Sequence, residues 1–368
     1  MDFDLDGAQR ELRGLAADVL AREAAPARLE AFERGGAAYD GATWRALART
    51  GLLGAVLPAD AGGAGLGPVG MAVLLREAGA RAAPVPLHAS LALGAAPIAR
   101  HGTPGQRALL APLAGGTGVL TGAYREVGPP GRVASTARAD GGGYVLDGVK
   151  TFVPYAREAS VILVPARVEG AGVGVFLVEP PEVTITPQPS ATTEPLSRLA
   201  LGGARVGREA LLGGAADGAA WDTLRRSAVA GIVALCSGVI RGALDLTKEY
   251  VKAREQFGQA LAEFQAVTMQ IGDVYIAKRA LDVAMWAGVW RLAEDADDVD
   301  EVLTVASYNA CGPVVKALYT CQHLHGGIGL DVTYPLHRYF AWAKHCGHLL
   351  GGADDRLDAL GALVAREA

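Results

Sequence analysis

The spacing of apolar residues divides the chain into a helical part, a β part and a second helical part. Up to about residue 117, Ala- and Leu-rich segments with scattered Arg and Glu, such as 8–23, 44–50 and 69–79, favour helices. From 119 to about 212, short β-branched runs are separated by Gly and Pro, which predicts an all-β module, barrel-like or sandwich-like.

From Trp221 onward the period is helical again, and it predicts four long helices at about 221–253, 261–293, 298–324 and 333–365. The short loops between them favour an antiparallel bundle. We therefore predict an α+β multidomain chain. Its three parts are an N-terminal helical domain at 1–117, a central β-barrel-like domain at 118–215 and a C-terminal four-helix bundle at 216–368.

The stretch from 250 to 270 connects the first two of these helices. Apolar residues at positions 250, 257, 261, 264, 267 and 271 predict one buried helical face. Gly258 predicts a break, because glycine inside a helix costs about 1 kcal/mol relative to alanine. The break leaves Arg254 and Gln256 at the end of one helix and Gln265 on the next. A guanidinium and two amides beside an aromatic ring suit a planar, phosphate-bearing ligand, although a core helix with solvated charges has the same composition.

Composition narrows the class of protein. The chain has 368 residues, of which 51% are hydrophobic, enough for two or three domains with their own cores. A net charge of −5 and the lack of a basic stripe argue against a nucleic-acid partner. The polar, acidic N-terminus is unlike a secretory signal, and the apolar run 227–240 is shorter than the roughly 20 residues of a membrane span. The four cysteines include no CxxC pair, so we expect a reduced, soluble, cytoplasmic protein.

Three segments, in this order, resemble motifs of the acyl-CoA dehydrogenase family. They are GLLGAVLPADAGGAGLG at 51–67, REQFGQALAEFQAV at 254–267 and HLHGGIG at 323–329. The resemblance implies that family's fold, FAD as cofactor, an acyl-CoA thioester as substrate and electron-transfer flavoprotein as redox partner. In the family, the Arg, Phe and Gln of the second motif reach across a subunit interface. There they hold the pyrophosphate and adenine half of an FAD that belongs mainly to the neighbouring subunit.

The resemblance also implies which residues contact the cofactor. His323 stands where the family commonly has glutamine and can still donate a hydrogen bond. The two glycines that follow it allow backbone N–H groups to approach a phosphate or adenine closely. The implied cofactor-binding residues are Arg254, Gln256, Phe257, Gln265, His323, Gly326 and Gly327.

The catalytic base of the family is missing from both of its known positions. Leu350 stands where most members have a glutamate, and the alternative position, within 226–229, also lacks a carboxylate. Asp354 and Asp355 are close in sequence, but one helical turn away they would point elsewhere. We therefore assign no catalytic residue, with a relocated base at Asp354 or Asp355 as the alternative.

The segments that face the flavin in the family have also diverged. The usual T-E-P-x-x-G-S-D is replaced by the sequence at 124–131, YREVGPPG. Phe152 replaces the tryptophan that covers the flavin, and Pro154 replaces a hydroxyl donor and has no side-chain donor of its own. We expect the chain's own flavin site to be eroded, while the residues that would serve a neighbour are retained.

One cluster of residues has the atom types of a metal site. Positions 321 and 325 would share a helical face while 323 points away, and no zinc spacing is present. We therefore expect no metal, and interpret these residues as buried thiols and loop histidines: Cys321, His323, His325, His345, Cys346 and His348.

These features suggest the base-lacking subunit of a heterotetrameric acyl-CoA dehydrogenase, similar to actinobacterial members that desaturate steroid-type side chains. A homologous catalytic subunit would be its partner. The alternatives are an autonomous homotetramer with a relocated base, and a flavin-free acyl-CoA-binding scaffold. The aromatic residues of the bundle predict an obligate oligomer, because they offer more apolar surface than one bundle buries: Trp286, Trp290, Tyr308, Tyr319 and Trp342.

Overall fold

The computed structural model describes residues 4–128 and 131–367. The N-terminal part is helical, as predicted. It contains α1 (Gly7–Glu23), α2 (Pro26–Gly35), α3 (Gly41–Arg49), α4 (Leu52–Ala55), η1 (Ala59–Ala61), α5 (Gly67–Ala80), the π-helix η2 (His88–Ala95), α6 (Ala96–His101), α7 (Pro104–Arg107) and α8 (Leu110–Ala114).

The central part consists of two sheets. One has the order β1-β5-β2-β3-β9, with β6 also paired to β5, and the other has the order β4-β8-β7. Their buried faces enclose an apolar core around Phe176, which is fully buried. The strands are β1 (Leu120–Gly122), β2 (Thr136–Asp140), β3 (Gly143–Asp147), β4 (Val149–Pro154), β5 (Val161–Val168), β6 (Val173–Val178), β7 (Thr184–Gln188), β8 (Leu196–Ala200) and β9 (Ala204–Gly207), and the short 3-10 turns η3 (Pro180–Glu182), η4 (Arg208–Ala210) and η5 (Leu212–Gly214) complete this part.

The C-terminal part is a helical bundle, but two of its four predicted helices are each broken in two. Gly312 and Pro313 separate α11 from α12, since proline has no N–H to continue the ladder and suits a first helical position. Gly351 and Gly352, with φ of +97° and +98°, separate α13 from α14. The helices are α9 (Ala219–Ala253), α10 (Gln265–Ala293), α11 (Val299–Cys311), α12 (Pro313–His325), α13 (Leu336–Leu350) and α14 (Ala353–Glu367).

The break predicted at Gly258 is present, but its form differs from the prediction. A small hairpin, β10 (Glu255–Gln256) with β11 (Gln259–Ala260), and a 3-10 turn, η6 (Leu261–Glu263), separate α9 from α10. Phe257 and Gly258 form the hairpin turn with φ of +54° and +82°, the backbone that two-residue hairpins prefer. The predicted continuous buried face is wrong, because Phe257 is 93% exposed at the tip of the hairpin.

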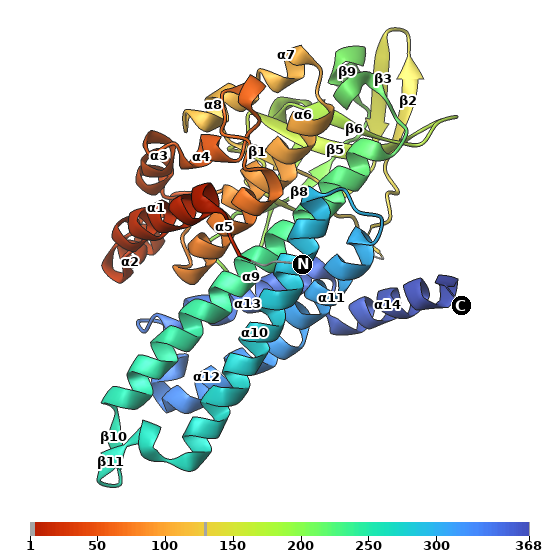
Figure 1. Ribbon diagram of the computed structural model, residues 1–368. Helices are drawn as coiled ribbons and strands as arrows, with labels where there is room; N and C mark the ends of the chain where they lie inside the picture. Colours follow the sequence, from red (N-terminus) through yellow and green to blue (C-terminus); the bar gives the residue numbers. More distant parts are fainter. Residues whose placement is uncertain (1–3, 129–130, 368) are drawn as a thin grey trace.

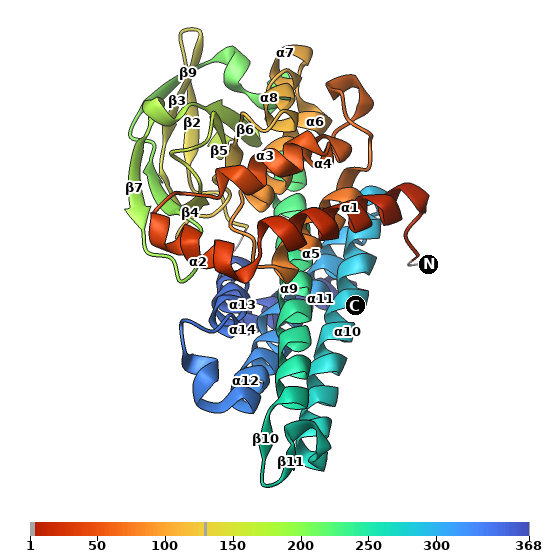
Figure 2. The same cartoon turned by 90° about the vertical axis from the view of Figure 1, so that its left-hand side faces the viewer.

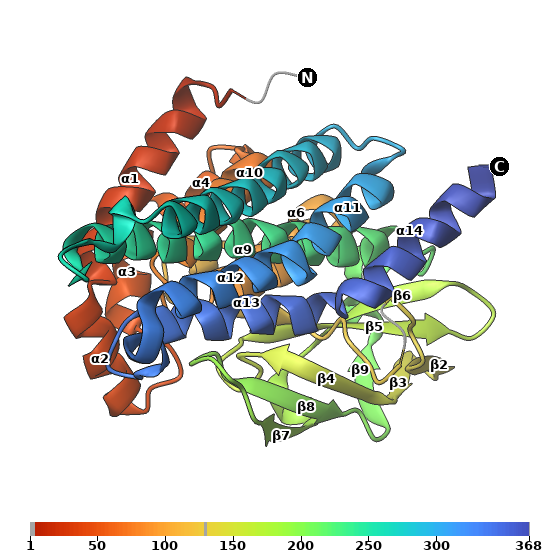
Figure 3. The ribbon, with the colours of Figure 1, turned by 90° about the horizontal axis from the view of Figure 1, so that it is seen from below.

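Helix α9 is the axis of the molecule. It packs against α5, α10 and α13, and Figures 1 and 2 show it running between these helices, with α10 and α13 to either side of it in Figure 2. Of the residues described, it is the single helix long and apolar enough to cross a bilayer, yet 83% of its apolar window is buried inside the fold. Figure 3 shows the two sheets beside α13 and the start of α14. The β part therefore meets the bundle at the junction of these two helices.

Candidate functional site

The hairpin between α9 and α10 carries most of the residues predicted to contact the cofactor. Arg254 is the C-cap of α9, Gln256 and Phe257 belong to the hairpin, and Gln265 is the first residue of α10. All four are exposed. In Figure 1 this hairpin lies at the end of the bundle that is farthest from the sheets.

The remaining predicted cofactor residues lie at the C-terminal end of α12. His323 is in the last turn of α12, and Gly326 and Gly327 begin the 3-10 helix η7 (Gly326–Leu330). All three are exposed, and Gly326 has a φ of +63°, which favours glycine.

Tyr250 joins these two segments. Its hydroxyl donates to the carbonyl of His325 at 3.2 Å, and the two rings stack with centroids 4.4 Å apart. His325 is fixed further by Cys321, whose carbonyl lies 2.8 Å from its Nδ1, and by the hydroxyl of Tyr334, 3.2 Å from its Nε2. Burial lowers the pKa of His325, so its ring is neutral at neutral pH. His325 belongs to the third motif and Tyr250 lies just before the second one, but their contact depends on the fold.

The side chains at this surface are free to bind another molecule. In the part of the chain that the structure describes, the Arg254 guanidinium and the Gln265 amide make no hydrogen bond or ion pair. The Phe257 ring forms a T-shaped pair with Phe264, with centroids 6.4 Å apart, and remains almost fully exposed to solvent. A free guanidinium, a free amide and an exposed ring fit the phosphate and adenine portions of a dinucleotide.

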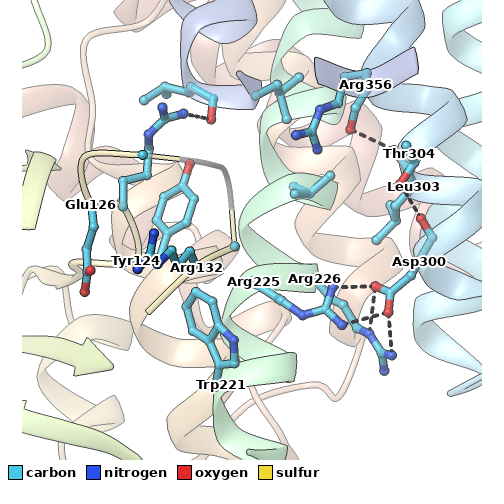
Figure 4. A pocket seen from close by; sticks show the side chains of 17 residues that line it. Tyr124, Glu126, Arg132, Trp221, Arg225, Arg226, Asp300, Leu303, Thr304 and Arg356 are labelled. Atoms are coloured by element: carbon cyan, nitrogen blue, oxygen red, sulfur yellow. Dashed lines mark hydrogen bonds and ion pairs between the residues drawn. The ribbon is translucent and has the colours of Figure 1, made fainter. Parts of the chain in front are cut away.

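A second candidate site is a cavity of about 150 Å³ at the junction of the sheets and the bundle. Figure 4 shows its walls, which come from the loop after β1, the start of α9, α11 and the α13–α14 junction. Leu350, the last residue of α13, lines it and is 3% exposed. Arg226 and Val229 line it from α9. Both positions at which the sequence lacks a base therefore face the same cavity.

Neither of the two aspartates considered as a relocated base lines this cavity. Asp354 and Asp355 are in the first turn of α14 and are exposed. Arg356, the next residue along the helix, is the member of this turn that faces the cavity.

The carboxylates that do line the cavity are held by cations. Asp300 accepts two hydrogen bonds from Arg225, both at 2.7 Å, and two from Arg226 at 3.1 and 2.9 Å. Burial by itself would raise the pKa of Asp300, but the hydrogen bonds from the two guanidinium groups outweigh it and lower the pKa to about 2. A carboxylate in this state is a poor proton acceptor at neutral pH.

Glu126 is the other carboxylate of the wall, and it stabilises the loop after β1. It accepts a hydrogen bond from Lys150 at 2.5 Å and others from the backbone N–H groups of Ala134 and Ser135. Burial would raise its pKa, and the hydrogen bond from Lys150 reverses the direction and lowers it.

The segments expected to face a flavin contact one another within the chain. Arg125 donates to the carbonyls of His348, at 2.8 Å, and Leu349, and its guanidinium lies 5.7 Å from the ring centroid of Phe152. The Phe152 N–H donates to the side chain of Gln188 at 2.8 Å. Pro129 and Pro130 of the same loop lie outside the described residues.

The six residues that have the atom types of a metal site lie in different surroundings. Across residues 4–128 and 131–367, no three His, Cys, Asp or Glu side chains converge on a point that could hold a metal ion. Cys321 and Cys346 are buried free thiols, and His345 forms a buried pair with Glu194, 2.8 Å from its Nε2. His323 and His348 are exposed.

Sequence comparison matches both helical parts to one family. Residues 6–117 match the N-terminal domain of acyl-CoA dehydrogenases, and residues 225–360 match the C-terminal domain. Acyl-CoA dehydrogenase FadE28 of Mycobacterium tuberculosis is 35% identical over 370 residues, which cover 98% of both chains. Acyl-CoA dehydrogenase FadE27 of the same organism is 32% identical over 379 residues, which cover 99% of both chains.

Solved structures extend the similarity to the whole fold. A variant of the Tcur3481–Tcur3483 steroid ACAD superposes with a TM-score of 0.90 at 39% identity, over 98% of both chains. The ChsE4–ChsE5 complex from Mycobacterium tuberculosis superposes with a TM-score of 0.93 at 31% identity, over 99% of both chains. The order of helices, sheets and bundle, and the matches to both domain profiles, lead to one conclusion: the chain belongs to the acyl-CoA dehydrogenase family.

Proposed function

We propose that this chain is the base-lacking subunit of a cytoplasmic, hetero-oligomeric acyl-CoA dehydrogenase, and that it completes the FAD site of a catalytic partner. The observation that carries the proposal is the wall of the cavity. Both family positions for a base face it with non-carboxylate side chains, and its two carboxylates, Glu126 and Asp300, are already ion-paired.

FAD would supply the acceptor for the substrate's β hydrogen, and this chain's contribution is to bind and orient it from the neighbouring side. Arg254 would pair with the pyrophosphate, since a guanidinium can donate two parallel hydrogen bonds to phosphate oxygens. Phe257 and Gln265 would contact the adenine half, together with backbone groups at Gly326 and Gly327. These residues are exposed, and the Arg254 guanidinium has no partner among the residues that the structure describes, as such a role requires.

The chain's own flavin slot is closed in this proposal. The Arg125 guanidinium covers Phe152 and donates to the end of α13, so it occupies the space between the loop after β1 and Leu349. A complex with one closed slot in each pair of subunits leaves more room for a bulky acyl group. The Tcur3481–Tcur3483 relative is described as a steroid ACAD, and we propose a steroid-type acyl-CoA as the substrate. Electron-transfer flavoprotein would reoxidise the partner.

Two experiments test this function. The first is expression of the chain alone and together with its catalytic partner, followed by absorption at the flavin bands and turnover with an artificial electron acceptor. The chain alone should be colourless and inactive, because loss of a positioned base typically removes a factor of about 10² to 10⁴ in rate. Asp354→Asn and Asp355→Asn should leave the turnover of the complex unchanged. Turnover by the chain alone that Asp354→Asn abolishes would establish the autonomous enzyme instead.

The second experiment removes the phosphate contact. Arg254→Ala should lower the FAD affinity of the assembled complex about ten- to hundredfold, the range for loss of a charge-assisted hydrogen bond. Lys252→Ala is the matched control, since Lys252 is an exposed cation two residues earlier on the same helix. Full flavin occupancy in the Arg254→Ala complex would contradict the proposal. A colourless complex with the unmodified chain would favour the flavin-free scaffold.

A further inference from the structure

The cavity beside Leu350 has an excess of positive charge. Its two carboxylates are neutralised, Glu126 by Lys150 and Asp300 by two arginines from α9. Five arginines line the same cavity: Arg125, Arg132, Arg225, Arg226 and Arg356.

Several polar groups of the wall lack a partner within the fold. The Arg356 Nε is buried and makes no hydrogen bond to any described residue, and the buried Tyr124 hydroxyl, which lies beside the Arg125 guanidinium, has no acceptor for its proton among those residues. Arg132 is exposed at the rim of the cavity rather than buried, and it makes no ion pair or hydrogen bond in the parts of the chain that the structure describes. Burial raises the pKa of Tyr124 to about 12, so its hydroxyl keeps its proton and can donate. Buried donors without acceptors are destabilising, unless a ligand satisfies them.

Apart from Thr304 and Ser307, whose hydroxyls donate to backbone carbonyls of α11, the rest of the cavity wall is apolar. Trp221 and Val229 contribute from α9, Leu303 from α11 and Leu350 from α13. Its volume of about 150 Å³ is that of a cavity known to hold a benzene ring. The wall thus combines hydrogen-bond donors and positive charge with room for one small apolar group.

We propose that this cavity binds a small organic anion. A carboxylate or phosphate group accepts from Arg356, Arg132 and the Tyr124 hydroxyl, and a body the size of one ring or a short chain packs against Leu303 and Leu350. The site requires neither flavin nor a base, so it goes beyond the function proposed above and can fail independently of it. In this view the cavity that no longer carries a base retains a binding role of its own.

The test is isothermal titration of the full chain, in the assembly in which it purifies, with benzoate, phenylphosphate and benzamide. We expect one of the two anions to bind at least tenfold more tightly than benzamide, which has the same ring without the charge. The comparison of benzoate with phenylphosphate then distinguishes a carboxylate site from a phosphate site.

Substitutions test whether the anion binds in this cavity. Arg356→Gln should weaken binding of the preferred anion about ten- to hundredfold. Arg132→Gln provides a second variant from a different segment, in case the first does not fold. Arg138→Gln is the control, because Arg138 is exposed on β2 and does not line the cavity. Equal binding of benzamide and the anions, no binding at millimolar concentration, or wild-type affinity in both cavity variants would overturn the proposal.

Discussion

In the cavity wall, the carboxylate of Asp300 forms ion pairs with two arginines at once. Its carboxylate receives bidentate hydrogen bonds from Arg225 and Arg226, neighbours on α9 that lie 75 and 74 residues away in sequence. The pair positions α11 against the start of α9. At the scale of single residues, therefore, this acidic group of the cavity wall serves to hold two helices together.

This contact makes a prediction about stability and pH. The folded pKa of Asp300, about 2, is below its ordinary value of 3.8. The ion pair therefore stabilises the fold fully above about pH 4 and loses this effect as the pH falls toward 2. The shift corresponds to at most about 2.5 kcal/mol, and solvent screening lowers this to about 1 kcal/mol, because the side chain is 32% exposed.

Asp300→Asn should accordingly lower the free energy of unfolding by about 1 kcal/mol at pH 7, and the difference from wild type should shrink as the pH falls from about 4 to about 2. Urea unfolding at a series of pH values measures both effects. Asp273→Asn is a suitable control, since Asp273 is exposed on α10. A difference that stays constant down to pH 3 would show that the ion pair is not responsible.

At the scale of elements, the hairpin between α9 and α10 is the clearest departure from the predicted helices. A positive φ at Phe257 is unfavourable for a residue with a side chain, and the ring at 93% exposure contributes little to the fold of one chain. In the function proposed above, this exposed ring contacts the cofactor of a neighbouring subunit. The breaks at Gly312 and Gly351 differ in kind, since they only redirect helices within the bundle.

Phe257→Ser should therefore separate folding from cofactor binding. The midpoint of thermal unfolding of the chain alone should not change measurably, because the substituted ring is exposed. Flavin retained by the assembled complex should fall. Phe176→Ser is the contrasting control, and its loss of a fully buried ring should cost about 3–5 kcal/mol of stability. A thermal midpoint that falls with Phe257→Ser would mean that the ring stabilises the chain itself.

At the scale of the whole molecule, one face of the bundle is apolar and exposed. The sequence predicted that five aromatic residues of the bundle would supply excess apolar surface, and this prediction is partly wrong. Tyr319 is exposed at 51%, but Trp342 is buried at 8% exposure. Trp286, Trp290 and Tyr308 are half-buried. The exposed apolar residues of α10 and α11 are instead Met269, Tyr275, Ile276, Val283 and Val305, of which the last four line a shared groove.

We expect this face to be covered in the assembled protein. Ile276→Glu, at a position 65% exposed, should leave the secondary structure of the chain intact but shift it to a smaller assembly in light scattering at micromolar concentration. Val364→Glu, on α14 at 64% exposure, is the matched control. A stable monomer of the unmodified chain would contradict the expectation of an oligomer.

The sequence by itself determined the family, the order of helical and β parts, and the absence of a carboxylate at Leu350. These properties are local, since they depend on apolar spacing, on Gly and Pro, and on motifs of a few neighbouring residues. It also located the break at Gly258. The helix breaks at Gly312–Pro313 and Gly351–Gly352 were visible as residue types, but the helical period on either side outweighed them in the prediction.

The tertiary structure alone decided which distant residues meet. Arg225 reaches Asp300, Arg125 reaches the carbonyl of His348, and Tyr250 stacks on His325, each across 75 or more residues of sequence. Contacts of this kind depend on how helices pack and on which rotamers fit, and no local pattern encodes them. The arginine-rich cavity is built from four such separate segments, so its charge and its unpartnered donors became apparent only once the chain was folded.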